Sequence, residues 1–233
     1  MLSINGFQKA LEYWQLFLEG VVCTVSLSAL TVIFGFILAL ILAVCRLGRS
    51  RVLRAISAVY VEVFRATPMV VQVFIIFYVV FNGVKVLPGF KLFGFIRFER
   101  FFPAVVALAL NSGAYLSEII RSGIQSIDGG QTEAARSLGL SAWKTMRFVV
   151  LPQAIKNILP AIANEFVTII KESAICYTIG VQDIMSAVNT VKGSTYRMGE
   201  ALIIATVLYF CLTYPTSKII AHFERKMSAG DKR

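Results

Sequence analysis

The chain has 233 residues, of which 57% are hydrophobic, and this apolar share excludes an ordinary soluble domain. Its length accommodates a single membrane domain, residues 1–233, of four to six helices that need roughly 20 residues each. The net charge is +10, but the basic residues cluster at the ends of apolar runs, which indicates lipid headgroups as partners and argues against nucleic acid.

The N-terminal part predicts an interfacial helix followed by a membrane span. Residues 1–16 place Phe7, Leu11 and Trp14 at helical spacing, which favours a short helix at the membrane surface. Residues 20–45 contain no charge and predict the first span. Four arginines follow within nine residues: Arg46, Arg49, Arg51 and Arg54. So basic a loop is expected in the cytoplasm, which places the N-terminus outside.

The second and third spans are predicted over residues 56–81 and 101–121, with an outer loop over 83–100 between them. Pro68 lies within the second span and predicts a kink or a local opening of the helix. The third span carries three polar residues at positions i, i+4 and i+7, which places them on one helical face. They are Asn111, Tyr115 and Glu118.

A fourth span is predicted over residues 152–175, an outer segment with a short helix over 176–199, and a fifth span over 200–217. With this topology, thirteen Lys and Arg residues lie inside and seven lie outside. The positive-inside rule therefore favours an all-α protein with five transmembrane helices, the N-terminus outside and the C-terminus in the cytoplasm.

The segment of about residues 125–150, between the third and fourth spans, is polar. Glu133, Ala134 and Ala135 favour a helix. Gly139 is able to adopt a positive φ and end this helix, and Ser141 is placed to cap the start of a second one. The segment is therefore predicted to be two short helices that project from the membrane. A plain cytoplasmic loop between two spans is the alternative.

The order of residues in this segment resembles the signature loop of permease subunits in bacterial binding-protein-dependent ABC importers. The matching positions are Glu133, Ala134, Ala135, Gly139, Val149, Leu151 and Pro152, with Val149 where isoleucine is more usual. Neighbouring residues resemble the polar amino acid branch of the family, which carries His-, Gln-, Glu- or Arg-type substrates. They are Gln131, Gln153, Ala154, Leu159, Pro160, Asn164, Lys171, Glu172 and Ser173. The resemblance extends over most of residues 15–225.

The resemblance implies a subunit of the bacterial cytoplasmic (inner) membrane that works within a complex. The implied partners are two ATPase subunits that carry ATP and Mg, a second permease subunit, identical or homologous, an external or periplasmic solute-binding protein, and an amino acid substrate. The resemblance also implies that the loop couples the chain to the ATPase, through Glu133, Ala134, Ala135, Leu138 and Gly139. A helix there would dock in a groove of the ATPase.

Chemistry within the chain itself is limited. The string Lys192-Gly193-Ser194-Thr195 has the wrong order for a P-loop, so the chain is not expected to bind ATP in that manner or to be an enzyme. The four cysteines show no paired spacing and His222 has no second ligand near it, so we expect no metal site.

Polar groups inside membrane spans are costly and mark candidate functional residues. The candidates for a substrate path are Arg65, Gln72, Asn111, Tyr115, Asn164, Glu165 and Thr168. The alternative is that they hold helices together or lie near a membrane surface. For the whole chain, the competing classes are a secondary transporter or channel and a helix-bundle scaffold or receptor. The absence of an inverted repeat argues against the commonest secondary transporters.

Overall fold

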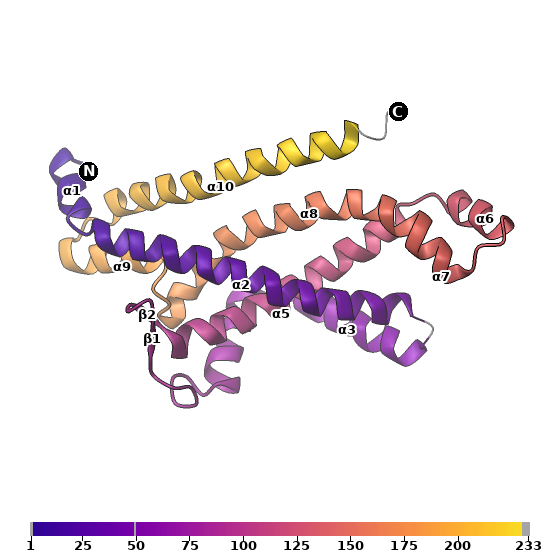
Figure 1. The fold of residues 1–233 in the computed structure, drawn as a ribbon. Helices are drawn as coiled ribbons and strands as arrows, with labels where there is room; N and C mark the ends of the chain where they lie inside the picture. The colour runs from indigo at the N-terminus through magenta and orange to yellow at the C-terminus, as the bar shows by residue number, and fades with distance from the viewer. Residues whose placement is uncertain (1, 49, 230–233) are drawn as a thin grey trace.

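The computed structural model describes residues 2–48 and 50–229, and most of them lie in helices (Figure 1). The helices are α1 (Ile4–Leu11), α2 (Trp14–Leu47), α3 (Arg51–Ala66), α4 (Met69–Phe74), α5 (Phe98–Gln125), α6 (Gly129–Ser137), α7 (Ala142–Thr145), α8 (Leu151–Glu172), α9 (Ile184–Thr195) and α10 (Met198–Ala229). Shorter elements are the π-helical turns η1 (Ile75–Val80) and η2 (Met146–Val150), the 3₁₀ segment η3 (Ser173–Ile179), and an antiparallel hairpin of β1 (Lys91–Leu92) and β2 (Ile96–Arg97). The predicted helical class is confirmed, with the hairpin as the one addition within the described residues. Arg49, Lys232 and Arg233, which were counted in the charge bias, lie outside the described residues.

Three helices of the described chain, α2, α5 and α10, are long and apolar enough to cross a membrane. Helix α3 and the segment formed by α4 and η1 meet at a bend of 108°. Together they count as a fourth span if they are one broken helix. The bend lies at Pro68, which precedes α4, so the predicted kink is confirmed. Helix α8 has 22 residues, about 33 Å at the α-helical rise, but it is not among the helices that are apolar enough to count as a span. The count of five spans stays a prediction.

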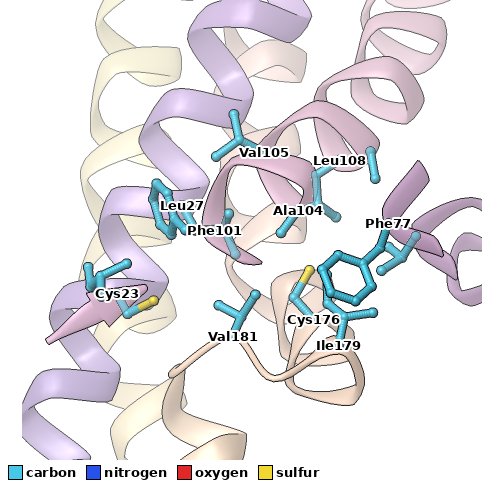
Figure 2. Close-up of a cluster of buried hydrophobic side chains, with 13 residues drawn as sticks. Cys23, Leu27, Phe77, Phe101, Ala104, Val105, Leu108, Cys176, Ile179 and Val181 are labelled. Atoms are coloured by element: carbon cyan, nitrogen blue, oxygen red, sulfur yellow. The ribbon is translucent and has the colours of Figure 1, made fainter. Parts of the chain in front are cut away.

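Helices α2 and α5 pack along each other and form the centre of the molecule. Small residues allow this approach, because a Cβ atom on Gly35 of α2 would lie 3.2 Å from the Ser112 side chain of α5. Figure 2 shows Leu27 of α2 and Leu108 of α5 in a buried apolar cluster, which residues of η1 and η3 complete. The segment that follows the bend at Pro68 and the segment that follows α8 therefore both pack against α2 and α5.

The loops gather at two opposite ends of the molecule (Figure 1). The C-terminal end of α2, the N-terminal end of α3, helices α6 and α7, and the C-terminal end of α10 lie at one end. Helices α1 and α9 and the hairpin lie at the other, where α1, α9 and parts of α2 and α10 share an apolar cluster. The arginine-rich loop and the segment of about residues 125–150 thus occupy the same end, as the predicted topology requires.

Candidate coupling and substrate-path sites

Helix α6 contains the first part of the predicted coupling loop. Asp128 caps its start by accepting a hydrogen bond from the Gly130 amide at 2.7 Å. At its end Gly139 has a φ of +83°, which confirms the predicted positive φ. The Gly139 amide donates to the Arg136 carbonyl, and the Leu140 amide donates to the Ala135 carbonyl. These two bonds form a Schellman cap, which makes the turn after α6 well defined.

Ser141 caps the start of helix α7, as predicted, and its hydroxyl accepts a hydrogen bond from the Lys144 amide at 3.3 Å. It has only four residues and continues through η2 into α8 without a break. Pro152 is the second residue of α8, at the junction with η2. A movement of this second short helix would therefore reach α8 through a continuous helical backbone.

The segment of about residues 125–150, which we call the coupling segment, has large apolar side chains that are exposed. Leu138 is 85% exposed, Trp143 67% and Phe148 64%. Of the residues predicted to couple, Ala135 is buried, whereas Glu133, Ala134, Leu138 and Gly139 are exposed. Exposed apolar residues of this size in a polar segment outside the spans are typical of a binding surface.

Gln72 and Asn111, two candidates for the substrate path, meet at the bend between α3 and α4. The Asn111 Nδ2 donates to Gln72 Oε1 at 2.9 Å, and both residues are buried. The Gln72 Nε2 donates to the carbonyls of Phe64 at 2.8 Å and Thr67 at 3.1 Å. The two amides therefore satisfy backbone acceptors that the broken helix leaves free.

Arg65 and Tyr115, two further candidates, contact each other at the surface of the single chain. The Arg65 guanidinium carbon lies 5.4 Å from the centre of the Tyr115 ring, within the range of a cation–π interaction. Both side chains are exposed. Arg65 is fourteen residues after the start of α3, about 21 Å along the helix.

The remaining candidates lie on α8. The Thr168 hydroxyl donates to the Asn164 carbonyl within the helix at 3.2 Å, so this bond is local. Glu165 is partly buried, and its carboxylate approaches the Ser112 hydroxyl of α5. The candidates thus form separate groups, one at the bend, one at the surface of α3 and α5, and one on α8.

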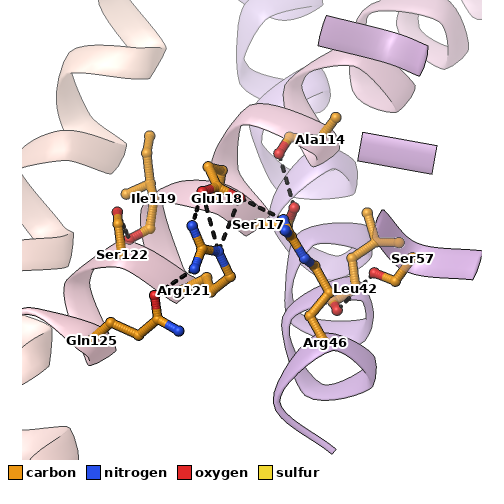
Figure 3. A network of polar contacts seen from close by, with 10 residues as sticks. All are labelled: Leu42, Arg46, Ser57, Ala114, Ser117, Glu118, Ile119, Arg121, Ser122 and Gln125. Carbon is orange, nitrogen blue, oxygen red and sulfur yellow. Dashed lines mark hydrogen bonds and ion pairs between the residues drawn. The ribbon is translucent and has the colours of Figure 1, made fainter. Parts of the chain in front are cut away.

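A charged cluster that sequence reasoning did not find joins α2 to α5 (Figure 3). Arg46, in the last turn of α2, donates to the Glu118 carboxylate. The Arg121 Nε donates to both oxygens of the same carboxylate at 3.1 Å. The sequence placed Glu118 on a polar face, but its partner Arg46 is 72 residues away. The available signal was that both residues end apolar runs at the predicted cytoplasmic surface.

Comparison with known proteins identifies the family. Residues 17–229 match the family described as binding-protein-dependent transport system inner membrane component. The chain belongs to this family of transport permeases. The family resemblance found in the sequence is thereby confirmed, and the permease family is a transport component without enzyme activity of its own.

Several relatives of this permease bear amino acid transport names. It is 42% identical to the arginine transport system permease protein of Bacillus subtilis, over 92% of this chain and 93% of the relative. It is 37% identical to the putative glutamine transport system permease protein of Rickettsia conorii, over 90% of this chain and 91% of the relative. A solved structure titled as an amino acid ABC transporter with histidines matches 97% of this chain and 100% of its own, with a TM-score of 0.87 and 38% identity.

Proposed function

We propose that this permease is the transmembrane subunit of an ATP-driven importer for a polar or charged L-amino acid. The substrate would pass from an external solute-binding protein across the bacterial cytoplasmic membrane. Two ATPase subunits, which hold ATP and Mg, and a second permease subunit would complete the complex. The family match over residues 17–229 and the arginine and glutamine permeases among the relatives support this proposal.

The observation that carries the proposal is the exposed apolar surface of the coupling segment. Leu138 and Trp143 lie outside the spans, at the end of the molecule that also holds the basic loop after α2. In our proposal α6 docks in a groove of the ATPase, with Glu133 orienting the helix and Gly139 turning the chain. Closure of the ATPase subunits then moves α7, η2 and α8 together, which converts an inward-open cavity to an outward-open one.

The proposed topology has five spans, with α8 as the one that composition alone does not identify. Helix α8 is long enough to span, and it packs beside α5, α2 and α10, so its polar residues need not face lipid. The N-terminus is then outside and the C-terminus cytoplasmic. Single cysteine labels in a cysteine-free background test this topology. Labels at Ser50 and Ser141 should react from the cytoplasm and one at Gly89 from outside, and reaction of Ser141 and Gly89 from one side would contradict it.

The substrate path is proposed along α3, α5 and α8. An exposed arginine at the depth of Arg65 is costly against lipid, so a water-filled cavity or the second permease subunit is expected to cover it. Tyr115 contacts it, and Asn164, Glu165 and Thr168 would face the same cavity from α8. Gln72 and Asn111 would shape this path by holding the bend, since their amide groups are used in that contact.

Copurification with the partner subunits tests the proposed function. The permease is co-expressed with a P-loop ATPase of an amino acid importer from the same organism, and the retained ATPase is quantified by mass spectrometry. Leu138→Glu should lose most of the ATPase, because it places a charge in the apolar contact. Tyr196→Glu, at the opposite end and 90% exposed, is the control and should retain it. Uptake that proceeds without any ATPase would instead indicate a secondary transporter.

A further inference from the structure

The hairpin of β1 and β2 turns through a residue that is unusual for its position. Phe93 and Gly94 have φ angles of +51° and +79°, so both lie in the left-handed region. Turns of this kind favour Asn, Asp or Gly at the first position, and a bulky side chain there is disfavoured. The Phe93 side chain is nevertheless 74% exposed, so packing within the described chain does little to offset this cost.

An apolar groove of about 360 Å³ lies between the hairpin and α2. The residues that line it are Ser26, Ala29, Leu30, Leu92, Phe93, Ile96 and Phe101. This volume is within the range of small-molecule sites. Phe93 therefore forms part of the wall of a groove that is apolar and open to the surroundings.

The depth of the groove follows from its position on α2. Leu30 and Ser26 precede Arg46 by sixteen and twenty residues, which is about 24 to 30 Å along the helix. If Arg46 marks one boundary of the hydrocarbon core, which is about 30 Å thick, the groove lies just inside the opposite boundary. The hairpin then stands at headgroup level, in the leaflet remote from α6 and α7.

The hairpin also carries two opposed positive charges. Lys91 and Arg97 pair directly across the strands, and both are exposed. Like charges opposite each other on a hairpin are destabilising. In the described part of the chain, neither side chain forms an ion pair or a hydrogen bond with another residue. An anion beside both residues would remove this repulsion.

We propose that the hairpin binds an anionic phospholipid, with an acyl chain in the groove and the phosphate beside Lys91 and Arg97. These two side chains leave the hairpin on the face away from Leu92 and Ile96, and they are long enough to reach a headgroup at its edge. Phe93 lies where aromatic side chains anchor proteins at the membrane interface. An acidic protein surface would match the charges but would leave the groove empty, so the lipid accounts for more of the observations.

The proposal is tested with the assembled transporter in nanodiscs of phosphatidylcholine that contain one-fifth phosphatidylglycerol. After gentle release, native mass spectrometry counts the phosphatidylglycerol that stays bound. The double variant Lys91→Gln with Arg97→Gln should retain at least about tenfold less, since each basic residue at the surface contributes about 1 kcal/mol toward anionic lipid. The double variant Lys85→Gln with Lys192→Gln removes two exposed charges from the same end and should retain the wild-type amount.

A second variant tests the groove separately. Leu30→Trp fills the groove without changing the charge, and it should also reduce the retained lipid. Wild-type retention in either Leu30→Trp or the Lys91 and Arg97 variant overturns the proposal. A third outcome also overturns it. In that outcome the Lys91 and Arg97 variant retains the wild-type amount of lipid, but the binding protein no longer stimulates its ATP hydrolysis, equally in discs with and without phosphatidylglycerol.

Discussion

The side-chain amides of Gln72 and Asn111 meet at 2.9 Å and join α4 to α5 at the bend of the broken helix. Both amides also donate to one backbone acceptor, the Phe64 carbonyl, at 2.8 and 3.2 Å. A carbonyl freed by a bend costs several kcal/mol in lipid unless it is satisfied. The pair thus satisfies a backbone acceptor at the 108° bend.

Replacing Asn111 with leucine should destabilise the protein. The change keeps the approximate shape but leaves Gln72 Oε1 buried without its donor, which costs about 1–3 kcal/mol. The thermal unfolding midpoint of the purified protein in detergent measures the effect. Asn189→Leu, at an exposed position of α9, is the control and should change stability little. An unchanged midpoint in Asn111→Leu would show that the amide pair does not hold the bend.

Gly139→Val should weaken coupling, since a residue with a Cβ atom resists the left-handed region by about 1–2 kcal/mol and a β-branched residue more. Gly129→Val is the matched control, because neither glycine has an atom within 4 Å of an added Cβ and only Gly139 has a positive φ. Retained ATPase and uptake per assembled complex are measured. Equal results for the two variants would mean that the turn geometry is unimportant.

The Glu118 carboxylate should stabilise the end of the bundle that faces the coupling segment. Glu118→Gln leaves Arg46 and Arg121 close together without the anion between them, so stability should fall by about 1 kcal/mol, and added salt should reduce the difference. A double-mutant cycle with Arg46→Gln measures the interaction itself. Arg54→Gln, an exposed arginine of α3, is the control. Additive effects of the two changes would contradict a direct pairing.

Asp183, which precedes α9, should make stability depend on pH. Its Oδ1 accepts a hydrogen bond from the Ser186 amide at 2.8 Å, whereas its Oδ2 is buried without a partner in the described chain. Burial raises the pKa of this carboxyl from 3.8 to about 8. The folded state therefore holds the proton more tightly than the unfolded state, and the resulting stability is complete below about pH 4 and lost as the pH rises through 8.

Unfolding midpoints between pH 6 and pH 9 check this sign. The wild type should lose stability as the pH rises, and Asp183→Asn, which cannot ionise, should lose less. Near Asp183 the thiols of Cys23 and Cys176 also ionise toward pH 9 in the unfolded chain, and the variant separates their contribution from that of the carboxyl. A steep fall that is the same in both proteins would assign the pH dependence to those groups.

Glu165→Gln should reduce uptake strongly while assembly and ATPase binding remain intact. The change keeps the shape of the side chain and removes the charge that would meet the ammonium group of a substrate. Asn164→Ala should give a smaller loss. Uptake is measured per assembled complex, so that poor assembly is not mistaken for lost transport. Wild-type uptake by an assembled Glu165→Gln complex would remove this residue from the proposed path.

The sequence by itself determined the features that depend on neighbours in the chain. The charge-free run over residues 20–45 predicts a membrane helix because hydrocarbon excludes charge, and α2 contains this run. Pro68 and Gly139 predict a bend and a turn because each restricts or frees its own backbone, and both are observed. The spacing between Glu133 and Pro152 was sufficient to find the family.

Only the tertiary structure decided which polar residues meet. Gln72 and Asn111 lie 39 residues apart, and Arg46 and Glu118 lie 72 apart, so helical periodicity within one span could not pair them. The sequence did not predict the hairpin, because each of its strands has two residues, too few to show an alternating pattern. The physical reason is the same for both pairs: a side chain's partner depends on how the helices cross, and that crossing results from packing over the whole chain.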